Sequence, residues 1–422
     1  MTSRPQRFSL RIRVQITLLA VVVGATLLAG WQLSQSSGSY QSAVREDLRR
    51  QAAMIEDIRK VYADEAPRAL QVAVAQARAD RLRPLRNQGR LAASEYTLAS
   101  QFAFHMRRSS PRDSLLGNDG YRYQDLGYDV LRRLADVQHD SPELYGLDPD
   151  ARMRAGDRWA TWGLAAAGVG AGAVLAAVCA ANVVRPRRMQ RAPAPSASRV
   201  LRELELLPQP ATARTGHRRG ALFHLSVFVL PLVLTLGQIL VAGAEQRAQA
   251  EASRKAAQVS ASIDGYGLRT AFHTEAQQTA LAVEFAATAR ELASLDTGVS
   301  PRDAQDERVL AAVESTLAVR VRAIADYMGR TPGPQDRIDA TAANALSVRP
   351  KTLSAAVAEQ NHQVTLAEQA GRRSLLLSAA TALAVVAEIL AVAAFAIGRP
   401  RWLWWPALGA LASTALAVVA FI

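Results

Sequence analysis

Hydrophobic positions in this chain are concentrated in five long runs, which lie at residues 14–33, 160–184, 221–244, 374–397 and 402–422. A helix needs about 20 residues to cross the hydrocarbon core of a bilayer, so each run is long enough to span a membrane. The pattern therefore predicts five transmembrane helices. Two long polar segments, residues 34–159 and 245–373, separate the first run from the second and the third from the fourth.

Inside the polar segments, apolar residues recur every three or four positions, which is typical of amphipathic helices. The stripe that runs from Val44 to Tyr62 predicts that the first membrane helix continues into the polar segment 34–159. The third run predicts a similar extension, which we expect to break near Asp264 because Gly265 and Gly267 follow.

Two matching tripartite signals predict the starts of further helices. Ser110, Pro111 and Asp113 form one of them and Ser300, Pro301 and Asp303 form the other, each offering an N-cap, a proline in the first turn and an acidic residue at N3. Asp148 followed by Pro149 predicts another start, for a helix that feeds into the second apolar run.

A polar segment that leaves and re-enters the same membrane face through helices needs an even number of long helical segments. The prolines, glycines and helix-start residues divide each polar segment into four. The sequence Glu95-Tyr-Thr-Leu-Ala99 is matched by Glu314-Ser-Thr-Leu-Ala318, which suggests an internal duplication, with chance similarity of alanine-rich helices as the alternative. We therefore expect an all-α polytopic membrane protein with five transmembrane helices and two extracytoplasmic up-down helical bundles.

This order of helix, polar bundle and helix resembles the extracytoplasmic four-helix-bundle sensor modules of chemoreceptors and sensor kinases. The resemblance rests on the order of elements in residues 14–184 and 221–397. It implies a sensory role for the exported segments. Those receptors also carry a large cytoplasmic signalling region, whereas the largest cytoplasmic segment expected here, residues 185–219, has 35 residues. A separate protein would then have to carry the output.

The charge distribution sets the expected orientation. The formal net charge is +13, and three short segments, residues 1–13, 185–219 and 398–401, together hold fifteen Arg and two Glu. Positive charge beside membrane helices marks the cytoplasmic side. We expect a multi-pass plasma-membrane protein with a cytoplasmic N-terminus, a cytoplasmic linker at 185–219, a cytoplasmic turn at 398–401 and an extracytoplasmic C-terminus. This location of the charge leaves no reason to expect nucleic-acid binding.

Composition adds two constraints. The single cysteine, Cys179, lies in the second apolar run, so no intrachain disulfide can form. Only three of the 50 basic residues are lysines, and this bias together with abundant alanine suggests a GC-rich bacterial genome.

The sequence contains no phosphate-binding loop, zinc-protease helix, nucleophile elbow or dinucleotide fingerprint. We therefore expect no catalytic residues, no cofactor and no metal, and no enzymatic activity. Asp136, His139, Asp140 and Glu143 are spaced so that one helical face presents several metal-ligand types, but a solvated charged face is the interpretation we prefer.

The most unusual exported stretch is residues 117–129, GNDGYRYQDLGYD, where tyrosines alternate with charges. Aromatic and charged side chains together suit a contact surface. The candidate ligand or partner contacts are Tyr121, Arg122, Tyr123, Asp125 and Tyr128. The alternative, which we favour, is a loop whose tyrosines pack on the bundle.

Glu388 is the only charged residue inside any of the five runs, and an intramembrane carboxylate normally faces a partner or a water-filled cavity. Pro231, Ser413 and Thr414 fall at a similar depth. A protonated Glu388 could donate to the carbonyl that Pro231 leaves unbonded or to one of the two hydroxyls. We prefer this structural role to a proton-coupled or gating role.

Two further features concern contacts of the membrane helices. Gly168 and Gly172 form a G-x-x-x-G pair that permits close helix packing, within the chain or with another chain. Trp402, Trp404 and Trp405 predict an interfacial anchor beside the 398–401 turn.

These features favour a non-enzymatic sensor-like or scaffold component whose exported helical domains bind a ligand or a protein. The expected partners are the lipid bilayer and a membrane or extracytoplasmic protein, with homo-oligomer formation left open. The alternative is a membrane subunit of a transporter or exporter that uses Glu388.

Overall fold

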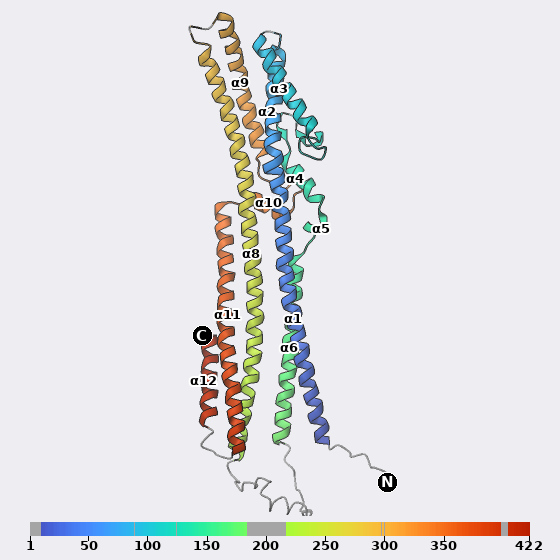
Figure 1. Ribbon diagram of the computed structural model, residues 1–422, viewed down its shortest axis with the longest axis vertical. Coiled ribbons are helices and arrows are strands. Elements are labelled where there is room, and N and C mark those ends of the chain that lie inside the picture. The colour runs from blue at the N-terminus through green and yellow to red at the C-terminus, as the bar shows by residue number, and fades with distance from the viewer. Residues whose placement is uncertain are drawn as a thin grey trace, which may run out of the picture. The chain divides into compact units, whose positions relative to one another are not determined.

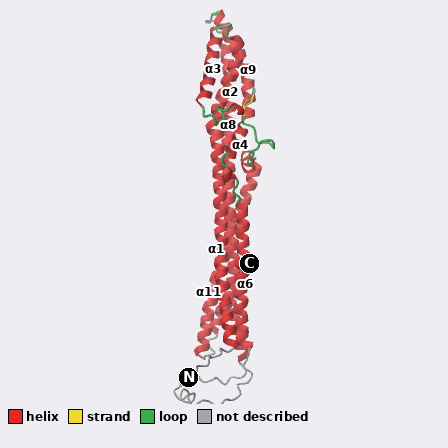
Figure 2. Ribbon diagram, turned by 90° about the vertical axis from the view of Figure 1, so that its right-hand side faces the viewer, coloured by secondary structure: helices red, strands yellow, loops and turns green. Residues whose placement is uncertain are grey.

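The computed structural model describes residues 10–87, 89–123, 125–183, 217–296, 298, 300–397 and 404–422. Most of the basic segments expected in the cytoplasm therefore lie outside the described residues, namely 1–9, 185–216 and the whole of 398–401. Helices cover most of the described chain, as the red ribbons of Figure 2 show.

The elements follow one another in the order shown by the colours of Figure 1. The first polar segment and its flanking runs contain α1 (Leu10–Arg59), a π-helix (Lys60–Glu65), α2 (Ala66–Leu82), a 3₁₀ turn (Arg83–Leu85), α3 (Arg90–Ser109), a second 3₁₀ turn (Asp119–Tyr121), β1 (Arg122–Tyr123), β2 (Gly127–Tyr128), α4 (Val130–His139), α5 (Pro142–Tyr145) and α6 (Pro149–Val183). The remainder contains α8 (His217–Ala293), α9 (Pro301–Met328), α10 (Ala340–Leu346), α11 (Pro350–Ile397) and α12 (Trp404–Phe421).

The chain divides into two compact units, each assembled from segments far apart in sequence. Unit 1 comprises Met1–Ala43, Asp150–Ala252 and His362–Ile422, and unit 2 comprises Val44–Pro149 and Ser253–Asn361. The helices α1, α8 and α11 each contribute residues to both units.

Four helices are long and apolar enough to cross a membrane, judged on length and composition over the described residues: Pro149–Ala176, Val229–Ala293, Lys351–Ala391 and Trp404–Phe421. They contain most of the second to fifth apolar runs. The first run, residues 14–33, is helical throughout but is not among these four, and several of its side chains lie outside the described set. The count of five spans is therefore not confirmed.

In unit 1, α1 and α6 pack through small residues at intervals of seven. A Cβ built at Gly156 would lie 2.5 Å from the Tyr40 ring, and one built at Gly163 would lie 3.1 Å from Leu33. The hydroxyl of Ser36 also donates to the Gly156 carbonyl at 2.9 Å. Glycine lets the two backbones approach closely enough for this bond, because it has no side chain to hold them apart.

The pair α11 and α12 uses alanine in the same way. Ala380, Ala384, Ala387 and Ala391 form a buried stripe on α11, and a Cβ built at Gly409 of α12 would lie 3.0 Å from Ala387. These small residues are spaced by three and four, so they share one face of the helix.

Both polar segments contribute to the main hydrophobic core of unit 2. The largest buried side chains of the first segment include Tyr62 and Leu134, and those of the second include Leu317 and Ile324, all within a single cluster. The helices α2, α3 and α9 lie side by side in this unit (Figure 1). Two separate exported bundles, one for each segment, are therefore not confirmed, since the apolar faces of the two segments cover each other.

Two local predictions were wrong. The helix α8 continues through Gly265 and Gly267 without a break. Gly265 packs tightly instead, because a Cβ there would lie 3.3 Å from both Ala345 and Ile58. The segment that begins at Ser110 forms turns and no helix.

In contrast, the start signal at Ser300 is confirmed. Its hydroxyl accepts a hydrogen bond from the Asp303 backbone N–H at 3.3 Å and donates to the Asp303 carboxylate at 2.7 Å. The helix start at Pro149 is confirmed as well.

Candidate functional site

Unit 2 has a pocket of about 680 Å³ between α4, the C-terminal end of α9 and the loop that follows α9. This volume is typical of sites for small molecules. The lining residues come from both polar segments, and are Asp129, Arg132, Ala135, Asp136, Tyr327, Arg330, Gln335, Asp336 and Arg337.

Arg330 organises one side of this pocket. Its guanidinium group donates to both carboxylate oxygens of Asp336, at 2.7 and 2.9 Å, and to Asp129 at 3.2 Å. The hydrogen bonds to Asp336 raise the pKa of Arg330, so its charge is permanent. Asp129 belongs to the first polar segment and Asp336 to the second, and Arg330 therefore links the two segments at the pocket.

Tyrosines surround the same site. The rings of Tyr123 and Tyr327 stack at 5.1 Å between centroids and 29° between planes, and the Arg330 guanidinium carbon lies 5.3 Å from the Tyr327 ring centre. The Tyr121 hydroxyl donates to Asp136 at 2.8 Å. Burial, followed by that hydrogen bond, raises the pKa of Tyr121, so its hydroxyl stays protonated at neutral pH and acts as a donor.

Two arginines at the pocket make no ion pair with any described residue. Arg132 donates to the backbone carbonyl of Gly120 at 3.1 Å, and its own backbone N–H donates to Asp129. Arg337 is exposed at the other side. Arg330 pairs with Asp129 and Asp336, and the other charged groups are these two guanidinium groups and the carboxylate of Asp136. The arginines and aspartates of the lining balance in formal charge, so the feature that can bind an anion is the pair of guanidinium groups without an ion pair.

The five residues predicted as ligand or partner contacts differ in burial and in their contacts. Tyr121 and Tyr128 are buried in the core of unit 2, as the alternative interpretation expected. Tyr123 is 54% exposed and Arg122 is exposed as well. Asp125 has a φ of 65° in the turn of the β1–β2 hairpin and accepts a hydrogen bond from Arg320 at 2.7 Å. The prediction of a contact surface on this hairpin stays a prediction.

Sequence reasoning missed Tyr327, Arg330 and Asp336 as members of the same site. The available signal was the loop GRTPGPQD at residues 329–336, whose glycines and prolines mark a turn with charges at both ends. Nothing local to that loop indicates that Asp129, some two hundred positions earlier in the chain, lies beside it.

The two hydroxyls predicted near Glu388 donate to backbone carbonyls. Ser413 is fully buried and donates to the Ala380 carbonyl at 2.7 Å, whereas Thr414 donates to the Ala410 carbonyl of its own helix. Pro231 is buried inside α8. Glu388 is half-buried on α11, so its structural or functional role stays a prediction.

The predicted G-x-x-x-G pair makes no close contact with the described part of the chain, because none of it lies within 4 Å of a Cβ built at Gly168 or Gly172. Gly156, Gly163 and Gly170 supply the face that meets α1 instead. Their seven-residue spacing was visible in the sequence.

Of the three tryptophans predicted as an interfacial anchor, Trp404 and Trp405 are 73% and 67% exposed. Trp402 lies outside the described residues. The anchor stays a prediction.

Across the part of the chain that the structure describes, no group of three or more His, Cys, Asp or Glu side chains could hold a metal ion. The predicted helical face with Asp136, His139, Asp140 and Glu143 lies in this part of the chain and forms no such group.

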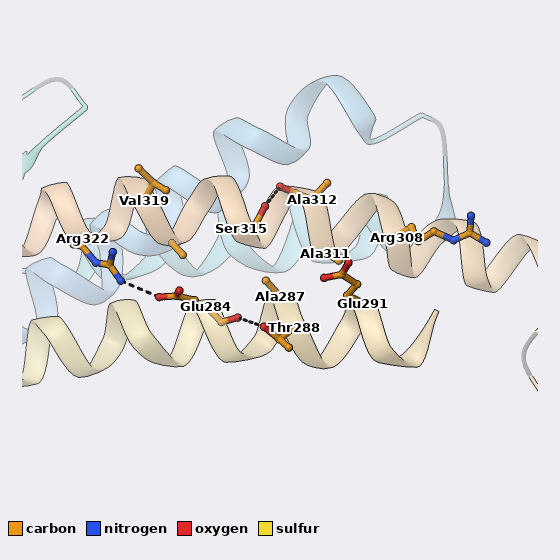
Figure 3. Close-up of a pocket in the computed structure, with 11 residues that line it drawn as sticks. Glu284, Ala287, Thr288, Glu291, Arg308, Ala311, Ala312, Ser315, Val319 and Arg322 are labelled. Atoms are coloured by element: carbon orange, nitrogen blue, oxygen red, sulfur yellow. Dashed lines mark hydrogen bonds and ion pairs between the residues drawn. The ribbon is translucent and has the colours of Figure 1, made fainter. Parts of the chain in front are cut away.

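A second pocket of about 430 Å³ lies between α8 and α9 (Figure 3). Alanines, among them Ala287 and Ala311, line it together with charged residues, and Glu284 of α8 accepts a 2.8 Å hydrogen bond from Arg322 of α9 across it. One arginine of its lining, Arg308, makes no ion pair with a described residue, whereas two such arginines line the pocket at Arg330.

The fold thus defines a mostly helical protein with four helices able to cross a membrane and a second compact unit that carries the polar pocket. No protein-family model, curated protein or solved structure matches the chain.

Proposed function

We propose that this chain is a non-enzymatic, sensor-like component of a bacterial plasma membrane, and that the Arg330 pocket of unit 2 binds a small anionic molecule. The observation that supports this most strongly is the pair of arginines, Arg132 and Arg337, that make no ion pair with any described residue at a pocket large enough for such a ligand. Guanidinium groups bind carboxylate and phosphate groups through paired hydrogen bonds.

The position of the pocket allows ligand binding to affect other parts of the chain. A ligand held by Arg132 of α4 and by Arg337 would bridge elements from the two polar segments. Those segments pack together with α1 and α8 residues in one core, and α1 and α8 each contribute residues to unit 1 as well. Binding that changes the packing of unit 2 can therefore act on helices that continue into the apolar runs.

For the topology, we propose five spans, a cytoplasmic N-terminus and an extracytoplasmic unit 2. The support is the arginine excess in residues 1–13, 185–219 and 398–401 and the near neutrality of the two polar segments. Because 35 residues between the second and third spans leave little room for a signalling domain, a partner protein would carry the output.

Ligand binding can be tested on the purified full-length protein in lipid nanodiscs by calorimetry, with succinate, glutamate and inorganic phosphate as probes. We expect at least one probe to bind, and the double substitution Arg132→Gln and Arg337→Gln to weaken its binding at least 10-fold. Arg122→Gln is the matched control, since Arg122 is an exposed arginine of the neighbouring hairpin that does not line the pocket. Absence of binding by all three probes, or equal loss in the control, would contradict the proposal.

The alternative function is a membrane subunit of a transporter or exporter. Its support is Glu388, a carboxylate on α11 within the candidate span Lys351–Ala391. Co-purification from native membranes separates the two functions, because an associated ATPase would favour export and an associated kinase or regulator would favour sensing.

A further inference from the structure

The helix α8 carries a second apolar face that its own unit does not use. Leu281, Phe285 and Leu292 are 46%, 71% and 64% exposed, and Leu295, just beyond the helix end, is 69% exposed. With Thr288 between them, these positions are separated by four, three, four and three residues, which is the spacing of a coiled-coil seam. We call these four apolar residues the α8 stripe.

The stripe is distinct from the face that joins the core. Ala276, Ala280, Val283 and Ala287 of the same helix segment are buried, and they point to another side of α8. A helix that is apolar on its outer face as well as its inner face needs a second covering surface.

Lipid is a poor covering for this stripe. Glu284 and Glu291 border it on one flank, and Arg290, on the opposite side of the helix, forms ion pairs with Glu95 and Glu307 at 3.1 and 3.2 Å. Several charges within about two helical turns would be costly to place in hydrocarbon. The covering surface is therefore that of a protein in water.

We propose that the α8 stripe is the interface between two copies of this chain, with their α8 helices parallel. The charges on the two flanks of the stripe select this arrangement. Glu284 and Glu291 lie on one flank, and the exposed Ala282 and Ala289 lie on the other. In a parallel pair, opposite flanks of the two helices meet, so each glutamate lies beside an alanine of the other copy.

An antiparallel pair would bring like flanks together and place Glu284 of one copy near Glu291 of the other, where like charges repel. Membrane insertion leads to the same choice. Two copies inserted in the same direction are related by an axis along the bilayer normal, and such a rotation cannot reverse the direction of a helix along that normal.

The groove between α8 and α9 continues this surface on the glutamate flank. Figure 3 shows Glu284 and Glu291 on α8 facing α9, where Val319 lies at the groove and is 70% exposed. The Glu284–Arg322 ion pair at 2.8 Å holds Glu284 toward α9 and away from the stripe. None of the stripe residues is itself charged, and this ion pair keeps the Glu284 carboxylate away from them.

Cysteine cross-linking of the full-length protein in native membranes tests both the contact and its direction. In a Cys179→Ser background, which removes the only cysteine, the chains would carry Phe285→Cys, Leu292→Cys or, as control, Glu275→Cys. Glu275 is an exposed α8 position outside the stripe. We expect Phe285→Cys and Leu292→Cys each to form covalent dimers with themselves and Glu275→Cys to form few.

Cross-linking that occurs only when Phe285→Cys and Leu292→Cys chains are mixed would establish an antiparallel pair and overturn the proposal. Failure of both cysteines to cross-link, or equal cross-linking of Glu275→Cys, would overturn it as well.

A second measurement does not depend on oxidation. Mass photometry of the protein in nanodiscs should show dimers that become at least 10-fold weaker with Leu292→Glu. Leu98→Glu is the matched control, because Leu98 of α3 is 66% exposed against 64% for Leu292 and is no part of the stripe. A monomeric unsubstituted protein, or dimers that survive Leu292→Glu, would refute the interface independently of any ligand at the Arg330 pocket.

Discussion

Arg254 donates a hydrogen bond to Asp47 across 3.4 Å, and both side chains are buried, with 8% and 4% of their surfaces exposed. Gln258 donates to the same carboxylate oxygen at 3.1 Å. The pair joins the first polar segment to the second within unit 2. A buried charge without its partner is costly, so this contact fixes which surfaces of the two segments meet.

Removing one member of this pair should destabilise the protein strongly. We expect Arg254→Met or Asp47→Leu alone to lower the free energy of unfolding by about 3–5 kcal/mol, and the double substitution to cost less than either single change. Chemical unfolding in detergent micelles would measure this. Glu56→Gln, which breaks the exposed Glu56–Arg59 pair, should leave the free energy of unfolding nearly unchanged, because solvent screens exposed ion pairs. If the double substitution instead lowered the free energy of unfolding by the sum of the two single effects, the two charges would not stabilise each other.

The pocket carboxylate Asp336 should make stability depend on acid pH. Burial alone would raise the pKa of Asp336, but hydrogen bonds from Arg330 and from the Gly333 backbone N–H lower it below its ordinary value of 3.8. A depressed folded-state pKa contributes stability that is present above the unfolded value and is lost as pH falls through the folded value.

We therefore expect the melting temperature of Asp336→Asn to lie below that of the original protein at pH 7, and to fall less between pH 5 and pH 3. Thermal unfolding monitored by circular dichroism gives both quantities. Asp140→Asn is the control, since Asp140 is exposed and makes no ion pair with a described residue. The prediction fails if Asp336→Asn loses as much stability in acid as the original protein.

A larger side chain at Gly163 should disturb the packing between α1 and α6, and one at Gly168 should not. Leu33 lies 3.1 Å from a Cβ built at Gly163, whereas no described residue lies within 4 Å of one built at Gly168. Overpacking of this kind typically costs about 1–3 kcal/mol. Gly163→Leu should reduce the thermal stability and the membrane level of the protein, measured with a fluorescent fusion, and Gly168→Leu should change neither. Sensitivity at Gly168 would indicate that this glycine contacts another chain.

Glu388→Gln should leave folding and the amount of membrane-inserted protein nearly unchanged. The amide has the size and hydrogen-bonding capacity of a protonated carboxyl group, so it can replace a neutral Glu388. Quantification in isolated membranes, with unsubstituted protein beside it, checks this. A large loss of assembled protein would mean that the ionised form is required.

The side of the membrane occupied by residues 185–219 is also testable. A protease-cleavage sequence inserted in this linker should be resistant in intact cells and cleaved in inside-out vesicles, because its arginines mark the cytoplasmic side. The same sequence inserted after Gly333, in the loop of unit 2, should show the opposite behaviour. Cleavage of the linker from outside would reverse the proposed orientation.

The sequence by itself determined the helices and the places where a membrane can be crossed. Hydrophobic period and run length are local properties, and so is the cap at Ser300, whose hydroxyl needs only the backbone N–H of Asp303 three residues on. For that reason the mostly helical fold and the four apolar helices could be predicted.

Tertiary structure decided where local signals compete with packing. Ser110, Pro111 and Asp113 carry the same signal as the Ser300 start, yet the backbone N–H of Leu115 donates to Glu65 at 2.8 Å and Leu115 is fully buried, which holds this segment in turns. Gly265 stays helical because Ala345 and Ile58 pack against it.

Tertiary structure also decided which segments pair. Alanine-rich apolar faces bind one another with little selectivity, so their sequence could not indicate that both polar segments share one core. Buried charge pairs such as Asp47 with Arg254 supply the missing selectivity, and the same pairing brings Asp129 to Arg330 and forms the pocket. Such contacts join residues about two hundred positions apart, and no local pattern in a single sequence identifies them.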